Sequence, residues 1–147
     1  MERIIGRISQ KEQLEDLYYS DNAEFAVVYG RRRVGKSYLV TEYFDNKFAF
    51  RHTGLSNVEM EDENILTQQL KAFGMSLRKH GSKERRAPKD WIEAFAWLED
   101  LLEATDSGER QVVFLDEMPW MDTPRSGFIT AFEHFWNGWG ASRHNLL

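Results

Sequence analysis

The sequence predicts an α/β fold with a mostly parallel sheet, and three observations support that prediction. Residues 25–29 (FAVVY) form a short apolar run, followed by a glycine-containing loop and a segment that can continue as a helix. Residues 111–115 (QVVFL) form a second run that ends in two carboxylates, as expected of a buried parallel strand with charge at its carboxyl edge. Segments with helical spacing of apolar residues alternate with these strands.

Length and composition favour one globular domain spanning residues 1–147. Of the 147 residues, 41% are hydrophobic and 14% aromatic, which is enough for a core. The net charge of −5 weighs against a dedicated nucleic-acid-binding protein, and the absence of cysteine excludes disulfides and thiolate metal sites. No apolar run approaches the roughly 18 residues of a membrane span, and the N-terminus lacks a signal-peptide core. We therefore expect a cytoplasmic protein with no membrane contact.

The first half of the chain predicts two strands that alternate with three helices. The expected order is helix, strand, helix, strand and helix, at residues 10–19, 25–29, 38–44, 47–53 and 65–80. A capping box of the pattern S-x-x-E begins at Ser9 and opens the first helix. Asp45 and Asn46 make a turn before the second strand, and residues 54–64 form a polar, acidic loop.

The second half predicts two helices, a strand and two connecting loops. The expected order is basic loop, helix, strand and exit loop, at residues 81–88, 91–106, 111–115 and 118–124, followed by the last helix. Asp90 caps the first of these helices, while Thr123 caps the last one with Pro124 at its first position. Both helices have wide apolar faces with Phe and Trp, which are expected to be core; the alternative is a ligand site for the first face and a docking surface for a partner for the last one. Residues 143–147 (RHNLL) begin a further strand.

The glycine-containing loop at residues 30–37 fits G-x-x-x-x-G-K-[ST], the phosphate-binding P-loop. Its glycines allow backbone N–H groups to wrap a phosphate chain, and the helix N-terminus adds a favourable dipole. Lys36 is expected to reach the β- and γ-phosphates and to act in catalysis, while the Ser37 hydroxyl binds Mg²⁺. The residues expected to contact the nucleotide are Gly30, Arg31, Arg32, Arg33, Val34, Gly35, Lys36, Ser37 and Tyr38. The alternative is a surface turn that matches the pattern by accident.

Asp116 and Glu117 follow the second apolar run directly. In P-loop NTPases an Asp at this edge of the sheet holds Mg²⁺, so we assign Asp116 to the metal. Glu117 is suited to orient and activate the attacking water as a general base. Two acidic residues at an exposed strand end are the alternative. ATP is favoured over GTP, because the chain lacks an N-K-x-D segment that would read guanine.

The motifs together resemble those of one prokaryotic family. The segment Ile5-Gly6-Arg7, the loop GRRRVGKS, and the run LDEMPW followed by RSGFITAFEHFWNGW resemble the STAND-type "archaeal ATPase" family of AAA+-related P-loop ATPases. The resemblance covers essentially the whole chain. It implies a three-layer P-loop NTPase fold of the additional-strand, catalytic-Glu type, and it places Gly6 and Arg7 near the adenine. It also implies the same roles for Lys36, Ser37, Asp116 and Glu117.

The resemblance further implies that the chain is the N-terminal part of a longer domain. In this class a strand with a polar sensor residue lies between the two motif strands, and here it would begin at about Asn145. The sensor strand, the lid helices and any C-terminal module are then missing, and a protein or DNA partner would act through that missing region. Oligomers are possible. Arg125 and Arg143 are candidates for an arginine that acts in trans, with an ordinary surface position as the alternative.

Two functions follow from these observations. The first is Mg²⁺-dependent binding and hydrolysis of ATP that drives a conformational switch in a longer regulatory ATPase, although the 147 residues alone could bind ATP without turnover. The second is a nucleotide-gated DNA- or protein-interaction module with little or no hydrolysis. The basic residues of the KERR segment (83–86) and the arginine triplet at 31–33 suggest it. A solvated connector is the alternative for the basic loop.

Overall fold

A computed structural model describes residues 2–5, 10–28, 36–56 and 62–147, with side chains over 10–28, 37–56 and 64–147. The elements in chain order are β1 (Glu2–Ile5), α1 (Gln10–Tyr18), β2 (Phe25–Val28), α2 (Lys36–Tyr43), β3 (Phe50–Thr53), α3 (Asp62–Lys79), α4 (Trp91–Ala104), β4 (Val113–Asp116), α5 (Met118–Met121), α6 (Phe128–Gly138) and the 3₁₀ turn η1 (Gly140–Ser142). The fold is therefore mixed α/β, as the alternation of apolar patterns predicted. None of the helices in this described part has the length and apolarity needed to cross a bilayer.

The strands form two separate parallel pairs. β1 pairs with β2 from Glu2↔Phe25 onwards, and β3 pairs with β4 with Thr53 opposite Asp116 at its end. The parallel pairing confirms the expectation for the strands at residues 25 and 113. β1 was not predicted, because a four-residue run with two charged or polar positions gives a weak pattern until its partner strand is known.

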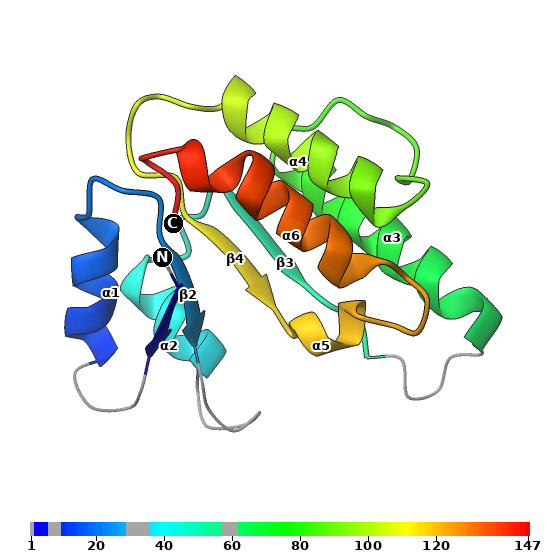
Figure 1. Cartoon of the computed structure of the whole chain (residues 1–147), viewed down its shortest axis with the longest axis horizontal. Coiled ribbons are helices and arrows are strands. Elements are labelled where there is room, and N and C mark those ends of the chain that lie inside the picture. The colour runs from blue at the N-terminus through cyan, green and yellow to red at the C-terminus, as the bar shows by residue number, and fades with distance from the viewer. Residues whose placement is uncertain (1, 6–9, 29–35, 57–61) are drawn as a thin grey trace.

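The C-terminal residues join the two pairs at one end. The carbonyl of Leu146 accepts a hydrogen bond from the N–H of Glu24 at 3.0 Å, just before β2. On the other side, the N–H of Gln111 donates to the carbonyl of Asn145 at 2.8 Å, and the N–H of Leu147 donates to Gln111 at 2.9 Å. The bridge between Gln111 and Leu146 is parallel, and it lies where the sequence predicted a further strand to begin. Figure 1 shows the C-terminus between the starts of β2 and β4, which separate as they run away from it.

The main core lies between the β3–β4 pair and the helices α3, α4 and α6 (Figure 1). Trp91 of α4 contacts Phe73 of α3 and Phe128 of α6, with ring centroids 5.2 Å and 4.9 Å apart. Such large side chains each stabilise the fold by about 1.5–3 kcal/mol when buried. The apolar face predicted for the α4 segment is confirmed as core, since its members are all buried: Trp91, Phe95, Leu98, Leu101 and Leu102.

A second, smaller cluster holds α1 and α2 against β2. Its buried members are Leu14 and Leu17 of α1. This part of the molecule is connected to the main core by Phe25, whose ring contacts Phe132 and Trp136 of α6 at 5.3 Å and 5.5 Å. Arg110 adds a polar connection, because its guanidinium donates to the carbonyl of Leu17 at 2.8 Å and to that of His144 at 2.6 Å.

Two helix starts test the sequence predictions. Asp90 caps α4 as predicted, since its carboxylate accepts a hydrogen bond from the Glu93 N–H at 2.8 Å. The start of the last helix at Pro124 is wrong, because α6 begins at Phe128 behind Gly127, which has φ 72°. The hydroxyl of Ser126 accepts from the Phe128 N–H at 3.2 Å and so satisfies one donor of the first turn. The box at Ser9 lies outside the described residues.

Other boundaries also differ from the predictions. The segment predicted as an exit loop contains the short helix α5, so the prediction of a loop there is wrong. β3 begins three residues later than predicted, at Phe50, and α3 begins three residues earlier, at Asp62. Pairing with β4 decides the extent of β3, and the polar first residues of α3 (DEN) lie outside the apolar repeat that predicted the helix, so neither boundary could be found from the local pattern.

His52 is buried in the middle of β3. Its Nδ1 atom pairs with the Ser76 hydroxyl of α3 at 2.7 Å, and its ring lies 5.0 Å from that of Phe73. Burial lowers the pKa of His52 from its ordinary value of 6.5 to about 4. At a pH between about 4 and 6.5, the imidazole is therefore neutral in the folded protein and protonated in the unfolded chain.

This burial predicts a pH-dependent loss of stability. Between pH 6.5 and about 4 the unfolded chain binds a proton at His52 that the folded chain does not, so the free energy of unfolding should fall as the pH falls through this range. The full shift corresponds to roughly 3 kcal/mol. His52→Gln cannot titrate, so it should lose less stability than the wild type over the same range. Urea unfolding of both proteins from pH 7.5 to 4 measures this, and a difference between them that stays constant with pH would contradict it.

Candidate functional site

Two residues from the predicted motifs meet at the carboxyl end of β4. Ser37 is the second residue of α2, and Asp116 is the last residue of β4. The Ser37 hydroxyl donates a hydrogen bond to Oδ2 of Asp116 at 2.6 Å, although the two residues lie 79 positions apart in the sequence. The start of α2 and the end of β4 thus form one polar site.

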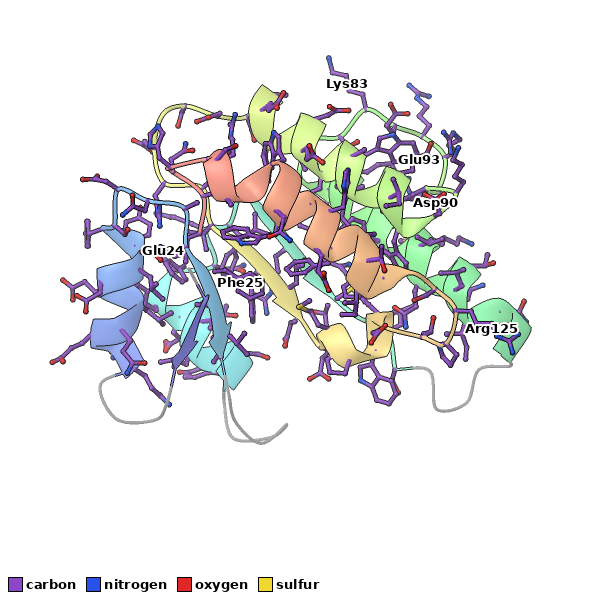
Figure 2. All side chains as sticks on the ribbon, viewed as in Figure 1. Glu24, Phe25, Lys83, Asp90, Glu93 and Arg125 are labelled. Atoms are coloured by element: carbon purple, nitrogen blue, oxygen red, sulfur yellow. The ribbon has the colours of Figure 1, made fainter. Side chains whose placement is uncertain are left out.

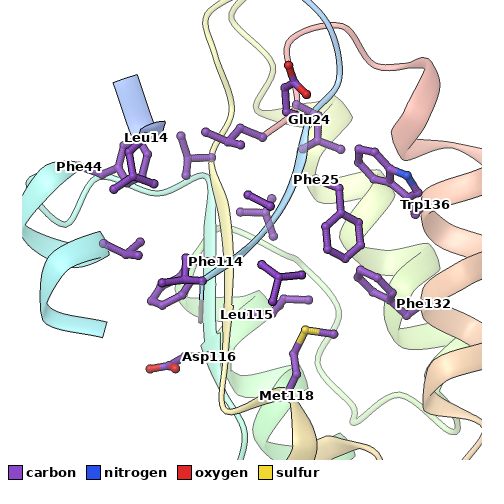
Figure 3. A pocket seen from close by; sticks show the side chains of 18 of the residues that line it. Leu14, Glu24, Phe25, Phe44, Phe114, Leu115, Asp116, Met118, Phe132 and Trp136 are labelled. Atoms are coloured by element: carbon purple, nitrogen blue, oxygen red, sulfur yellow. The ribbon is translucent and has the colours of Figure 1, made fainter. Parts of the chain in front are cut away.

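Two hydrogen bonds hold the carboxylate of Asp116 in one orientation. Its side chain is buried, and its second oxygen, Oδ1, accepts from the Glu117 N–H at 2.9 Å. Figure 3 shows Phe114 and Asp116 on the α2 side of β4, with Leu115 on the side of α6, as alternation along a strand requires. The carboxylate therefore faces the start of α2 with both oxygens engaged.

The donor set of this site suits a cation only in part. A carboxylate and a hydroxyl are oxygen ligands of the kind that Mg²⁺ prefers, and Mg²⁺ commonly takes one or two protein ligands beside phosphate and water. Within the described ranges, no group of three or more His, Cys, Asp or Glu side chains is arranged to hold a metal. Ser37 and Asp116 thus fit a metal that arrives with a phosphate ligand, and not a metal held by protein side chains alone.

Glu117 stands beside Asp116 at an unusual backbone position. Its φ and ψ are 58° and 39°, in the left-handed region, which costs a residue with a Cβ on the order of 1 kcal/mol. Its carbonyl accepts a hydrogen bond from the Trp120 N–H at 3.1 Å, in the turn that opens α5. The chain therefore leaves β4 by a sharp turn at Glu117, whose side chain is half-buried.

α2 supplies the other side of the site through its N-terminal turn. The helix begins at Lys36, so its first backbone N–H groups have no partner within the helix and favour an anion. Tyr38 is 68% exposed, and a hydrogen bond with the Glu42 carboxylate one turn later raises the pKa of its phenol. The Tyr38 side chain therefore projects into solvent from the first turn of α2.

Several residues that the sequence assigned to the site lie outside the described residues. They are Gly6, Arg7, Gly30, Arg31, Arg32, Arg33, Val34 and Gly35, together with the side chain of Lys36. The described chain stops at Val28, the end of β2, and resumes at the first residue of α2. The predicted order of strand, glycine-containing segment and helix agrees with these two ends.

The basic residues that the sequence suggested for DNA contact or for an arginine acting in trans either pair with acidic side chains or lie on peripheral loops. Arg86 forms two hydrogen bonds with the Glu93 carboxylate, at 2.6 Å and 3.0 Å, and lies over the Trp97 ring at 4.8 Å. The bond to Arg86 is the main reason why the pKa of Glu93 falls to about 2. Arg143 pairs with Asp106 at 2.8 Å. Figure 2 shows Lys83 and Arg125 on loops at the periphery of the molecule.

An apolar cavity of about 580 Å³ separates β2 from β4 and ends at this site. Figure 3 shows Phe25, Phe132 and Trp136 along one side and Asp116 at its lower end. The side chains of β2 and most of those of β4 are only half-buried as a result. The two motif strands thus face each other across an open space, with residues 145–147 at the far end.

Sequence reasoning missed two residues that support the site. The N–H of Gly54, directly after β3, donates to the carbonyl of Asp116 at 2.9 Å, and Gln69 of α3 binds the backbone of the next residue, Leu55. The signal in the sequence that could have pointed to Gly54 was its place directly after the strand predicted at 47–53, which was expected in the same sheet as Asp116. The register needed to recognise its role comes only from the strand pairing.

Comparisons of the chain with protein-family models, with curated proteins and with solved structures found no match. The resemblance to the "archaeal ATPase" family therefore stays a hypothesis based on the motifs. The geometry of Ser37, Asp116 and Glu117 is the observation that bears on function.

The bond between Ser37 and Asp116 predicts a measurable coupling. A hydrogen bond to a buried carboxylate contributes about 1.5–3 kcal/mol, so Ser37→Ala and Asp116→Ala should be less destabilising together than the sum of their separate effects, by roughly that amount. Urea unfolding of the two single variants and the double variant gives the coupling energy. Ser37→Ala combined with Asp122→Ala, an exposed carboxylate, is the control and should be additive within about 0.5 kcal/mol. Additivity in the first pair would show that the bond has no energetic weight.

Proposed function

We propose that the protein binds ATP with Mg²⁺ between the start of α2 and the end of β4, and hydrolyses it to drive a conformational switch in a longer regulatory protein. The observation that supports this most is the 2.6 Å hydrogen bond from Ser37 to Asp116. It brings a hydroxyl and a carboxylate, from the two segments that match nucleotide motifs, within reach of one cation. A chance match of two unrelated patterns would not be expected to produce this contact.

A three-layer P-loop NTPase fold of the additional-strand, catalytic-Glu type is part of the same proposal. The parallel pairing and the order of β2 and α2 agree with it. Val113 and Leu115 pack on the core of α3, α4 and α6, while Asp116, on the opposite side of β4, bonds Ser37 of α2, and Phe114 on that same side contacts Phe48 of the loop after α2, at 5.7 Å between rings. Helices thus lie on both faces of β4, as a three-layer arrangement requires.

The residues of the site divide the work in this proposal. The backbone N–H groups of the first turn of α2 and the ammonium of Lys36 would hold the phosphates. Ser37 and Asp116 would hold Mg²⁺, which neutralises charge on the phosphates when it is bound with ATP. Glu117 would accept a proton from the attacking water, since it is the carboxylate directly after Asp116 and its backbone is held in a defined turn at the end of β4.

The alternative of a nucleotide-gated DNA-binding module has less support. In the KERR segment, Arg86 is held by Glu93 and by Trp97, so it is not free to contact a phosphate backbone without breaking those contacts. Binding of a protein partner without hydrolysis is an outcome that the following experiment distinguishes.

The proposal predicts separate effects on binding and hydrolysis. Lys36→Ala should weaken ATP binding, whereas Glu117→Gln should keep the Kd for ATP and lower hydrolysis by about 10²–10⁴-fold, the usual contribution of a general base. Fluorescence titration with and without Mg²⁺ measures binding, with GTP as competitor, and phosphate release measures turnover. Glu109→Gln, an exposed carboxylate, should change neither and serves as control.

The outcomes separate the alternatives. Absence of Mg²⁺-dependent ATP binding by the wild type would overturn the proposal, and preference for GTP would overturn the choice of nucleotide. Full turnover by Glu117→Gln would remove Glu117 from the role of general base. Binding without turnover by the wild type would favour the interaction module.

We also propose that a further strand belongs between β2 and β4, in continuation of Asn145–Leu147. Residues 145–147 already make backbone hydrogen bonds to both neighbours and run parallel to Gln111–Val113. The cavity beyond Leu147 is lined mainly by apolar side chains of β2, β4 and α6. The edges of β2 and β4 that face it have donors and acceptors suited to such a strand.

A short extension after Leu147 tests this. Five added residues of sequence Val-Ile-Val-Ile-Thr should raise the free energy of unfolding by about 1–3 kcal/mol, because apolar burial of about 1.5–3 kcal/mol per side chain exceeds an ordering cost of about 1–2 kcal/mol per residue. Amide hydrogen exchange should slow in β2 and β4. The matched extension Val-Pro-Val-Pro-Thr lacks two N–H donors and should stabilise less. Equal effects of both extensions would argue against strand formation.

A further inference from the structure

Gly54 lies where β3 and the turn at Glu117 come closest. It is buried, and its N–H donates to the carbonyl of Asp116 at 2.9 Å, one residue beyond the last pair of the β3–β4 ladder. A Cβ at this position would lie 2.6 Å from the carbonyl oxygen of Glu117, 3.1 Å from Cγ of Met121 and 3.3 Å from Cβ of Trp120. The first contact is with backbone, so no side-chain movement relieves it. Only glycine allows the Glu117 turn to occupy its place.

Gln69 holds the chain that follows Gly54. Its side chain on α3 is fully buried. Its Oε1 accepts from the Leu55 N–H at 3.1 Å, and its Nε2 donates to the Leu55 carbonyl at 2.7 Å. One amide thus satisfies both backbone groups of one residue. A leucine would fill a similar volume without a polar group to bury, so packing alone does not account for a glutamine here.

These contacts act on the peptide groups on either side of Glu117. The N–H of Glu117 donates to the Asp116 carboxylate at 2.9 Å. The carbonyl of Glu117 accepts from the Trp120 N–H at 3.1 Å, and its oxygen occupies the space that a side chain at position 54 would need. Because these groups have fixed partners, the left-handed conformation of Glu117 is imposed by its surroundings. The direction of the Glu117 side chain follows from that conformation.

We propose that Gly54 and Gln69 are positioning residues for Glu117. Gly54 acts by having no side chain, and Gln69 acts by fixing Leu55 so that Gly54 stays against the turn. This inference rests on the proposed function for its catalytic consequence, because it assumes that Glu117 orients water. Its structural part, that Gly54 and Gln69 set the backbone of Glu117, stands on the contacts alone.

Gly54→Ala tests the proposal directly. The added methyl should displace the Glu117 turn and lower kcat for ATP by roughly 10²-fold, the scale expected when a catalytic group moves by about 1 Å. The KM for ATP should change by less than about twofold, because Ser37 and α2 are untouched. In ¹⁵N–¹H spectra the amide signals of Glu117 and Met118 should shift, while that of Ser37 should not. Gly138→Ala is the control, since its Cβ would lie at an ordinary 3.9 Å from His134 and should change none of these.

Gln69→Leu provides a second, independent variant. It removes both bonds to Leu55 and should also shift the amide signals of Glu117 and Met118 and lower kcat more than it raises KM. Ser76→Ala is its matched control, because Ser76 lies on the same helix and bonds His52, not Leu55. Ser76→Ala should lower stability and leave the Glu117 signals and the kinetics in place.

The spectra and the kinetics separate the two ideas. If the wild type does not hydrolyse ATP, the proposed function fails, and the shift of the Glu117 amide still decides whether Gly54 and Gln69 position it. Unshifted Glu117 signals in Gly54→Ala, or in Gln69→Leu if the first variant does not fold, would overturn the inference. Equal losses in Gln69→Leu and Ser76→Ala would do the same, because they would reduce Gln69 to a general contribution to stability.

Discussion

The relative placement of the two parallel strand pairs depends on a few backbone hydrogen bonds made by Asn145–Leu147. These residues contact Glu24 on one side and Gln111 on the other, and so fix where β2 starts relative to β4. The aromatic contact of Phe25 with α6 and the guanidinium of Arg110 support the same junction. The meeting of Ser37 with Asp116 lies at the opposite end of these strands, so its geometry follows from how the junction sets their direction.

Much of the fold could be predicted because local chemistry and the global arrangement agree. Asp90 and the apolar face of α4 are examples, since a cap and a helical repeat need only their near neighbours. The start of α6 could not be predicted in the same way. Thr123 and Pro124 form a plausible helix start, but positive φ angles at Arg125 and Gly127 delay the helix to Phe128. Such angles reflect how the loop must cross from α5 to α6, which is information about tertiary structure.

The site likewise contains residues that could be predicted from the sequence and residues that could not. Ser37 and Asp116 could be paired from sequence, because each follows or precedes an element whose type and direction the pattern predicts. The conformation of Glu117 could not, because a residue with a Cβ ordinarily avoids the left-handed region. Gly54 was overlooked for a related reason. Its lack of a side chain matters only where another backbone approaches, and that approach is set by the β3–β4 register.

The position of the junction at the very end of the described chain bears on how the protein is made. During synthesis, α1, β2 and α2 emerge first and can pack around Leu14 and Leu17. The junction with Glu24 must wait for Leu146, after nearly all of the described residues have left the ribosome. Contacts of such long sequence separation form slowly, because closing the intervening chain costs entropy before the contact is gained. The placement of β2 against β4 is therefore set after the elements on both sides of it have formed, and a nascent chain would not present the Ser37–Asp116 site in its final geometry until residues 145–147 have emerged.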